Sequence, residues 1–533
     1  MFRSLQRLHA SLATLFRLCP KGRHEIFGVI SSNSPFRLKR KEEIEWYYQQ
    51  SLSVLRYVPE IESAVLELIV QKCLELDVEI RISDQGEVSI EVDEIFDLEV
   101  DEPATQNNST PPDASVDDTA EKLDILMMML LSYLDSNLQR DPTQAKILYA
   151  SLIRVFEGSI LQTHKSKFTQ FLIMYLCGVE VRQLEASSVN VGDEMTLYRD
   201  FAARLIGFIV DPYRATTTRQ AGTCYLASFV SRSSYVCHET TCEAVCALLR
   251  WADVYLQSPS AGRSLASNSQ EQAVLHALFY TVCQAAFYIM CFRGVEAINY
   301  YREEKQKGAL DLDHINIDAV KWTQICGHPL QPLRFCLESV RTEFLEVSRY
   351  FGLIEESVLE RLQDEERQLA TTKQRKKTAN RIATPAMLEK ERRTGGVGGL
   401  GQGSNPLDSF FPFDPYLLRR SHVFIDPLYR HWTGSIDAML DDSDDESDED
   451  EAVIVPDDRE DEDDESDEDD GSADRRTVTF QPMSMASNLA SYSSRSTVAL
   501  SPDVTTIHRE TQRQAWSETL KRTRAPSMEN GSW

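Results

Sequence analysis

The chain has 533 residues, 42% of them hydrophobic, and a formal net charge of −28. This length allows about two or three ordinary domains or one extended repeat array. The charge is uneven: residues 441–470 hold 21 acidic side chains against the single Arg459, and the other 503 residues carry a net charge of only −8. A general binder of duplex DNA needs a basic surface, so we expect any role on nucleic acid to be indirect.

Cysteine usage and hydropathy set two further limits. The eleven cysteines are scattered and include no CxxC pair. That pattern favours reduced thiols in the cytosol or nucleus over a secreted disulfide framework. The longest wholly apolar run is the short ILMMMLL at 125–131, well below the roughly 18 residues needed to cross a bilayer. We therefore expect no membrane span.

The N-terminal segment allows two interpretations. Its first 24 residues contain five basic and no acidic side chains, a composition typical of a mitochondrial presequence. However, residues 15–30 align without a gap on residues 54–69, at an offset of 39, and Pro20 falls on Pro59. Such an offset, with an apolar helix, a proline turn and a second apolar helix, is typical of stacked HEAT-type hairpins. We favour this structural interpretation, which places the basic residues on the outer face of a first helix.

Apolar residues recur at three- and four-residue spacing along the rest of the chain, which predicts further helices. These predicted helices cover residues 121–138, 145–161, 167–179, 194–210, 218–232, 240–256, 277–293, 333–351 and 355–369. Asp118 or Thr119 is a suitable N-cap for the first of them. The segments at 240–256 and 277–293 are apolar on most faces, as inner helices are. The predicted fold is all-α, a HEAT-repeat-like helical solenoid of residues 1–365.

Three segments interrupt this pattern. Residues 82–121 contain 13 acidic and no basic side chains, which predicts a disordered loop, although part of the segment alternates as a strand does. Residues 366–404 begin basic and end glycine-rich, as a flexible linker does. Residues 436–533 lack a sustained apolar period and are predicted to be disordered. The KQRKK run at 373–377 is a candidate nuclear import signal.

Two patterns that suggest bound groups lack the required context. GVGGLG at 396–401 matches the dinucleotide fingerprint, but that fingerprint needs a strand before it and a helix after it. Cys237, His238, Cys242 and Cys246 are close in sequence, yet the last two lie one turn apart on an apolar helix, where cysteine behaves as a small hydrophobe. We predict no cofactor, no metal site and no catalytic residues, and do not expect an enzyme.

Five serines are candidate phosphorylation sites. Ser443, Ser447 and Ser466 each have an acidic residue three positions later, a context that suits acidophilic kinases. Ser501 and Ser527 lie in the Ser/Thr-rich tail beyond the acidic run. Phosphate adds roughly two negative charges per site and can switch a docking surface. The simpler interpretation of the acidic run, a solvated polyanion that keeps the chain soluble, stays open.

The stretch NPLDSFFPFDPYLLRRSHVFIDPLYRHW, within residues 405–435, is the most unusual part of the sequence. Its four prolines exclude one regular helix, and its seven aromatic residues are too many for a solvated linker. We expect it to pack against a protein surface. The candidate docking or structural residues are Asn405, Pro406, Leu407, Asp408, Phe410, Phe411, Pro412, Phe413, Asp414, Pro415, Phe424, Ile425, Asp426, Pro427, Tyr429 and Trp432.

This stretch strongly resembles the signature of the TIF-IA family of RNA polymerase I-specific initiation factors. The family pattern N-P-L-D-x-F-F-P-F-D-P, followed by F-I-D-P-x-Y-x-x-W, matches residues 405–415 and 424–432. Other stretches are similar to the same family, and the resemblance covers most of residues 7–432. These further stretches are residues 57–78, 120–134, 219–232 and 276–293.

The resemblance implies a HEAT-repeat solenoid that binds RNA polymerase I and bridges it to promoter-bound initiation factors. It implies contact with the ribosomal DNA promoter mainly through those factors, control by kinases, and a location in the nucleus and nucleolus. Family members usually carry additional helical repeats ahead of the point where this sequence begins. The resemblance therefore leaves open whether Met1 is the true start; with a misassigned start, the first repeat is uncapped and its outer face is apolar.

Two questions remain open at this stage. We expect the aromatic residues of 405–435 to pack back across the last helices of the array, with Asp408, Asp414 and Asp426 capping turns. The packed stretch is then either a docking site for polymerase or promoter factors or a purely structural cap of the array. The alternative function is that of a HEAT-repeat transport adaptor or acidic chaperone, which binds cargo or histones through the acidic run. The sequence does not decide whether the free protein forms a homodimer.

Overall fold

The computed structural model describes most of the chain up to residue 432, and all described residues belong to one compact unit that includes Met1–Leu440. The described residues are 2–82, 88–90, 113–163, 166–186, 196–262, 269–308, 315–317, 319–362, 364, 367, 411–413 and 416–432. The predicted linker at 366–404, apart from Arg367, and the predicted tail at 436–533 lie outside these residues. The five candidate phosphorylation sites, the KQRKK run and GVGGLG lie outside them too.

The first four helices form two hairpins of the same design. Helix α1 (Phe2–Leu18) leads into α2 (Gly22–Ser32), and α3 (Lys41–Val54) leads through the short turn η1 (Pro59–Ile61) into α4 (Glu62–Asp77). Each hairpin turns at a proline: Pro20 lies in the turn just ahead of α2, and Pro59 is the first residue of η1, a position that suits proline because its missing N–H is not needed there. The repeat that was predicted from the offset of 39 residues is therefore present in the structure.

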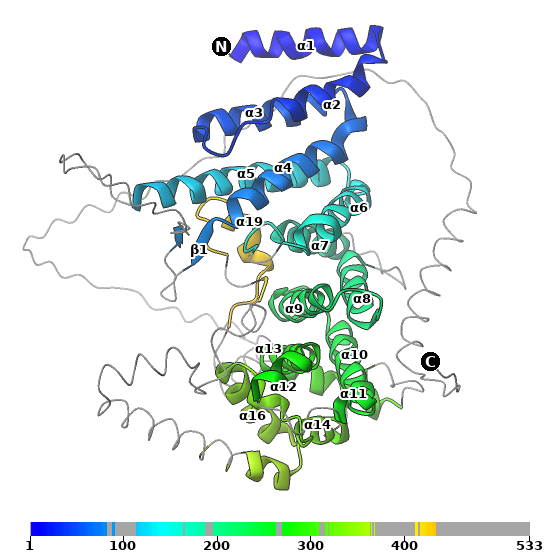
Figure 1. The fold of residues 1–533 in the computed structure, drawn as a ribbon. Helices are drawn as coiled ribbons and strands as arrows, with labels where there is room; N and C mark the ends of the chain where they lie inside the picture. The colour runs from blue at the N-terminus through cyan, green and yellow to red at the C-terminus, as the bar shows by residue number, and fades with distance from the viewer. Residues whose placement is uncertain are drawn as a thin grey trace, which may run out of the picture. The chain divides into compact units, whose positions relative to one another are not determined.

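Further helices stack in chain order beyond this pair of hairpins, as the blue-to-green progression in Figure 1 shows. They are α5 (Asp113–Arg140), α6 (Gln144–Val155) with the π-helical turn η3 (Phe156–Ile160), α7 (Phe171–Ala186), α8 (Leu197–Val210), α9 (Thr216–Arg232), α10 (His238–Leu256), α11 (Pro259–Gly262), α12 (Ser269–Leu275), α13 (Ala277–Gln306), α14 (Ala319–Cys326), α15 (Pro332–Phe335) and α16 (Glu338–Phe351). The predicted all-α solenoid is confirmed.

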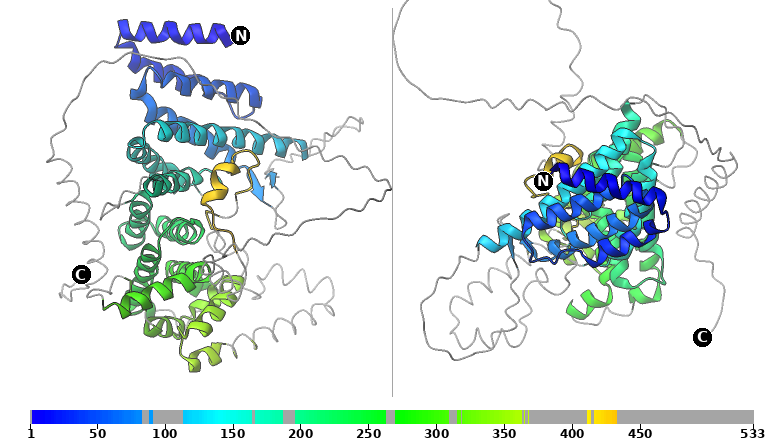
Figure 2. Two further views of the ribbon diagram at one scale, coloured as in Figure 1. Left: turned by 180° about the vertical axis from the view of Figure 1, so that it is seen from behind. Right: turned by 90° about the horizontal axis from the view of Figure 1, so that it is seen from above.

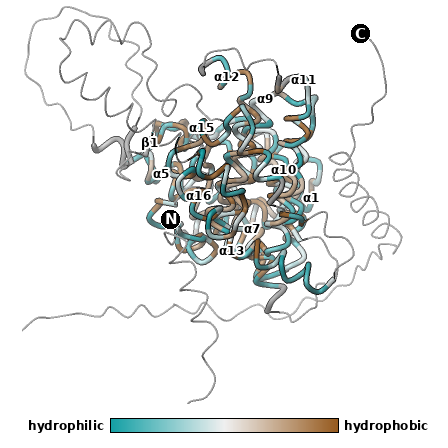
Figure 3. Tube along the Cα trace, turned by 90° about the horizontal axis from the view of Figure 1, so that it is seen from below, coloured by the Kyte–Doolittle hydropathy of each residue, from teal (hydrophilic) through white to brown (hydrophobic). Residues whose placement is uncertain are grey.

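Most side chains of helices α9, α10 and α13 are buried. Apolar stretches, brown in Figure 3, run through the interior of the helix stack. By length and composition α13 could cross a membrane, but its most apolar stretch is entirely buried among other helices of the described chain. The same composition is typical of a central core helix. Its side chains Phe287 and Ile289 are fully buried.

The prediction of a disordered loop over residues 82–121 is wrong at both ends of that range. Strand β1 (Ile80–Ile82) pairs antiparallel with β2 (Val88–Ile90), so part of the predicted loop is a short ribbon. Helix α5 begins at Asp113, ahead of both predicted N-caps, and Asp118 instead pairs with Lys122 inside the helix, 2.6 Å away. Acidic residues are stabilising in the first turns of a helix, which is why an acid-rich composition did not exclude a helix here.

Two further differences concern helix ends. The predicted helix at 333–351 is interrupted, because the Leu337 N–H donates to the side chain of Gln284 on α13 (2.9 Å) instead of continuing α15. Helix α13 continues to Gln306, beyond the predicted end at residue 293, and α14 was not predicted although it contains the fully buried Trp322. Contacts between helices, rather than the local sequence pattern, determine where these helices begin and end.

Candidate functional site

The signature stretch crosses the middle of the helix stack. We call its described residues, 411–413 and 416–432, the strap; it includes the short helix α19 (His422–Ile425) and the turn η4 (Asp426–Leu428). Figure 1 shows it in gold, beside α5 and α7 and descending past α9 towards α13, and Figure 2 shows the same placement from behind. The strap therefore contacts helices that are far apart in sequence.

Phe413 is the central anchor of the strap. Its ring is fully buried against Phe171 of α7 (5.2 Å between ring centroids) and against Tyr225 and Phe229 of α9 (6.0 and 5.7 Å). Its N–H donates to Ser228 Oγ (2.9 Å). A fully buried aromatic ring of this kind contributes strongly to stability, so Phe413 ties α7 to α9.

Two neighbouring aromatic rings of the strap extend this anchor in opposite directions. Tyr416 packs edge-on against Phe168 and Phe171 (5.5 and 4.8 Å), and burial raises the pKa of its phenol well above the usual value. Phe411 lies parallel to Tyr288 of α13, with 4.1 Å between centroids, and is only half buried. Between these rings, the Pro412 carbonyl accepts a hydrogen bond from a buried glutamine, Gln170.

Asp124 of α5 holds the strap ahead of α19. Its buried carboxylate accepts hydrogen bonds from the backbone N–H groups of Arg420 (2.7 Å) and Ser421 (2.9 Å) and from the Ser421 hydroxyl. A buried carboxylate is stable only when such donors surround it. Asp124 therefore fixes the backbone conformation at the point where the strap passes over α5.

Helix α19 and the following turn lie against α7. Phe424 packs edge-on against Tyr175, with centroids 5.5 Å apart, and Ile425 is fully buried. Leu428 fits over Gly178, where an added Cβ would come within 2.5 Å of a Leu428 methyl carbon. The absence of a side chain at this glycine lets the strap approach the helix. The Pro427 carbonyl accepts a hydrogen bond from Arg182 (2.7 Å).

The strap next pairs with the backbone that follows α9. Tyr429 and Ser233 form an isolated antiparallel bridge, the Ser234 N–H donates to the Leu428 carbonyl (3.0 Å), and the Arg430 N–H donates to the Arg232 carbonyl (2.6 Å). The Tyr429 hydroxyl donates back to the Phe413 carbonyl (3.0 Å). The two halves of the strap are thus joined to each other as well as to the helices.

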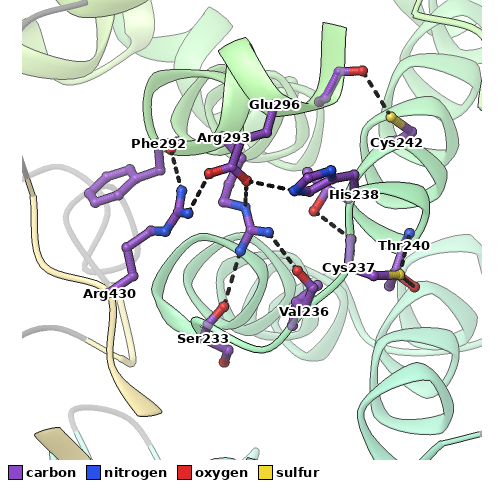
Figure 4. A network of polar contacts seen from close by, with 12 residues as sticks. Ser233, Val236, Cys237, His238, Thr240, Cys242, Phe292, Arg293, Glu296 and Arg430 are labelled. Atoms are coloured by element: carbon purple, nitrogen blue, oxygen red, sulfur yellow. Dashed lines mark hydrogen bonds and ion pairs between the residues drawn. The ribbon is translucent and has the colours of Figure 1, made fainter. Parts of the chain in front are cut away.

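Arg430 makes an ionic anchor on α13 (Figure 4). Its guanidinium donates to the Phe292 carbonyl (3.1 Å) and pairs with Glu296, which also contacts Arg293 (2.9 Å) and His238 (3.6 Å). Arg293 is almost fully buried and donates to two carbonyls, and burial lowers the pKa of its guanidinium to about 10. Glu296 therefore neutralises two guanidinium groups, those of Arg293 and Arg430, where the strap ends.

The predicted arrangement of the signature residues needs correction. The strap packs on the middle helices α5, α7, α9 and α13, not on the last helices of the array, and Asp426 does not cap a turn: its carboxylate contacts His422 Nδ1 (2.7 Å). Trp432 remains 39% exposed at the edge of Phe292, with centroids 4.7 Å apart. The remaining signature residues lie outside the described part of the chain: Asn405, Pro406, Leu407, Asp408, Phe410, Asp414 and Pro415.

Sequence reasoning missed the residues that receive the strap. Asp124 lies between Leu123 and the apolar run at 125–131 of a core helix, and an acid at such a position is a usable signal of a buried polar contact. Gly178 and Glu296 show no comparable signal, because their roles depend on which segment approaches them. The receiving surface therefore became apparent only from the structure.

The cysteines near His238 have ordinary structural positions. Cys237 is the N-cap of α10 and accepts from the Thr240 N–H (3.5 Å), whereas Cys242 and Cys246 donate to the carbonyls of Ala297 (3.3 Å) and Asn316 (2.9 Å). Among the residues that the structure describes, no group of three or more His, Cys, Asp or Glu side chains is arranged to bind a metal ion.

A comparison with models of protein families shows which family has this combination of helix stack and strap. A model described as "RNA polymerase I specific transcription initiation factor RRN3" matches residues 3–436, which include the helix stack and the strap. The chain belongs to the RRN3 family. The resemblance that the signature stretch indicated is thereby confirmed.

Individual RRN3 relatives are distant but extensive matches. The RNA polymerase I-specific transcription initiation factor RRN3 of Mus musculus is 27% identical over 80% of this chain, and the chain spans 60% of that relative's length. The rrn3 factor of Schizosaccharomyces pombe is 25% identical over 84% of this chain and 70% of its own. A crystal structure of RNA polymerase I transcription initiation factor Rrn3 superposes with a TM-score of 0.54, 18% identity and coverage of 80% of this chain and 73% of that one.

Proposed function

We propose that this chain acts as an RNA polymerase I-specific initiation factor that binds the polymerase and bridges it to promoter-bound factors at ribosomal RNA genes. The observation that carries the proposal is the family match over residues 3–436. A stack of helices offers a long surface for protein partners. The charge outside the acidic run is close to neutral, which suits bridging between proteins better than reading DNA bases. The proposal assigns no catalytic step to the chain.

The direct test uses the full chain and purified RNA polymerase I. The immobilised full-length protein should retain the polymerase, and so should a matched variant that lacks residues 436–533. Adding the protein to an extract depleted of its own RRN3 factor should restore specific transcription from a ribosomal DNA template. A chain that neither retains the polymerase nor restores transcription would refute the proposal.

The competing function, a transport adaptor or acidic chaperone, is favoured by one observation, the run of 21 acidic side chains at 441–470. It requires that purified histones or transport cargo bind to the full chain and that deletion of residues 436–533 abolishes the binding. If histone binding depends on the tail and polymerase binding is absent, the chaperone function replaces the initiation factor.

The same proposal includes a cellular location and a mode of control. We expect the chain in the nucleus and nucleolus, with nuclear import weakened when the basic residues of the 373–377 run are replaced by alanine. Phosphate on Ser443, Ser447, Ser466, Ser501 or Ser527 would be detected by mass spectrometry of the protein isolated from cells. Sedimentation of the free protein at several concentrations tests the homodimer that the sequence left open.

For the strap, we propose a structural role as a brace across the helix stack. The support is that its central aromatic residue is fully buried and that its carbonyl and N–H groups bond to four different helices or their ends. A separate docking role is then left to its outward side chains, such as Leu417, Val423 and Trp432, which are exposed. Substituting the buried and the outward residues separately distinguishes the two roles.

A further inference from the structure

Two basic segments that are distant in sequence meet over the first turns of α5. One is the connection between α2 and α3, and the other is the part of the strap just ahead of α19 (Figures 1 and 2). Lys41 Nζ and Arg420 Nη2 contact the same carboxylate, Glu121, at 2.6 and 2.7 Å. Lys122 Nζ donates to the carbonyl of Arg37 (3.3 Å), which joins the same connection to α5.

This meeting point exposes apolar and basic side chains together. Leu38 is 77% exposed and Phe36 is 60% exposed, which is unusual for two large apolar residues so close in sequence. We call the surface the basic-apolar edge and define it by Phe36, Arg37, Leu38, Lys39, Arg40, Lys41, Arg419 and Arg420.

The positive charge of the basic-apolar edge is only partly neutralised. Lys39 and Arg40 share one carboxylate, Glu43, at 3.4 and 3.0 Å. Lys41 and Arg420 likewise share Glu121, and Arg37 pairs with Glu79. Arg419 is exposed beside them, and Glu42 is the remaining acid near Lys41. With Asp124, which accepts from the backbone N–H of Arg420, five carboxylates among the described residues face the six cations of the edge, so the edge suits an acidic segment that also carries apolar side chains.

The chain contains a segment with this chemistry, attached close by. Residues 91–102, EVDEIFDLEVDE, have seven acidic, five apolar and no basic side chains. The segment follows β2 directly, and β2 pairs with β1 so that Ile90 lies opposite Ile80, the residue after the Arg37 partner Glu79. It precedes α5, which carries Glu121. Twelve extended residues span up to about 40 Å, so the attachment points leave the edge within reach.

We propose that residues 91–102 bind to the basic-apolar edge of the same molecule. The apolar side chains of the segment cover Phe36 and Leu38, and its carboxylates pair with Lys39, Arg40 and Arg419. Attachment through a short connection gives the segment an effective concentration on the order of millimolar, so weak individual contacts suffice for occupancy. The exposed apolar residues of the edge are thereby an internal docking site for this segment.

Hydrogen exchange of the full chain tests the occupancy. The variant Asp93→Asn, Glu94→Gln, Asp97→Asn and Glu99→Gln removes four charges from the segment, and the matched control Asp461→Asn, Glu462→Gln, Asp463→Asn and Glu465→Gln removes four from the acidic run. We expect amide exchange at residues 36–41 to rise several-fold in the first variant and to stay unchanged in the control. Equal exchange in the two variants would overturn the proposal.

A binding measurement with an added peptide is a second test of the basic-apolar edge as a docking site. A fluorescent peptide with the sequence of residues 91–102 should bind the four-site variant more tightly than the intact chain, whose edge is already occupied. Lys39→Ala with Arg40→Ala should weaken this binding about fivefold, the effect of two exposed ion pairs, without changing the melting temperature. Arg56→Ala with Arg349→Ala, two exposed arginines elsewhere, is the matched control. Equal peptide affinity for the intact and four-site proteins would refute intramolecular docking.

Discussion

The two ends of the strap are held by contacts of different kinds. At its beginning, the ring of Phe413 is fully buried among rings from α7 and α9. At its end, Arg430 pairs with Glu296, and the side chains of this pair remain 29% and 27% exposed. Both ends connect the strap to the helix stack, but the first uses apolar burial and the second uses charge.

The difference indicates which end stabilises the fold and which end positions the chain. Full burial of a large apolar side chain contributes about 1.5–3 kcal/mol, whereas a partly exposed ion pair contributes about 0–1 kcal/mol because water solvates both partners. The aromatic end is therefore expected to carry most of the binding energy of the strap. The ionic end has directional contacts to the Phe292 carbonyl and to Glu296, which fix where the strap leaves the stack.

The largest expected effect is that of Phe413→Ala, which removes the buried ring. Loss of a buried aromatic side chain costs about 3–5 kcal/mol, so this variant should unfold at clearly lower denaturant concentration and temperature. Phe411→Ala is the matched control, because Phe411 is half buried and, among the residues that the structure describes, stacks on the ring of Tyr288. Its expected cost is about 1 kcal/mol.

The same pair of variants distinguishes a brace from a docking site. A brace predicts that Phe413→Ala lowers the melting temperature far more than Phe411→Ala does. Normal melting of Phe413→Ala together with loss of RNA polymerase I binding would contradict the brace and support direct docking by this part of the strap.

The next largest effect concerns a polar contact that is as buried as the aromatic ring. Asp124→Asn removes the charge that accepts the N–H groups of Arg420 and Ser421, and leaving buried donors poorly satisfied costs about 1–3 kcal/mol. Asp426→Asn is the matched control on the strap, since its carboxylate contacts His422 at the exposed surface. If both variants unfold at the same denaturant concentration, burial is not what makes a polar strap contact strong.

An intermediate effect is expected where the strap passes over α7. Gly178→Ala places a Cβ within 2.5 Å of Leu428 and 2.8 Å of Tyr235, and overpacking of this kind costs about 1–3 kcal/mol. The far end of Leu428 can move, so we expect the lower half of that range. Leu428→Ala removes the nearer obstacle and leaves the Tyr235 ring carbon at 2.8 Å, so Gly178→Ala should cost less in that background; additive costs would show that Leu428 is not the main obstacle.

The helices were largely predictable from sequence because their signal is local. Apolar residues at helical spacing identified segments such as 194–210 and 218–232, which are close to α8 and α9 in the structure. The burial of Phe413 was likewise expected from an aromatic stretch that prolines prevent from being a helix. What such patterns report is that a residue is covered. They do not identify the residues that cover it.

The missing information is the partner, and here the partners are far apart in sequence. Gln170 and Pro412, which share a buried hydrogen bond, are separated by 242 residues. Periodicity along one helix cannot encode that pairing, so the strap was expected on the last helices rather than on α5, α7, α9 and α13. The interruption before α16 has the same origin, since apolar spacing continues through residues 333–351 and the contact with Gln284 of α13 interrupts the helix.

The smallest expected effect is that of Arg430→Gln at the ionic end. Glu296 keeps its contact with Arg293 when Arg430 is replaced, so no carboxylate is left without a cation, and we expect a loss of about 1 kcal/mol or less. Salt screens partly exposed charges, so the difference from the unmodified protein should shrink further when denaturation is measured in about 1 M salt. Arg349→Gln, which removes an exposed arginine of α16 away from the strap, should show no difference at either salt concentration. A cost for Arg430→Gln as large as that of Phe413→Ala, and insensitive to salt, would mean that the ionic end stabilises the strap as strongly as the aromatic end does.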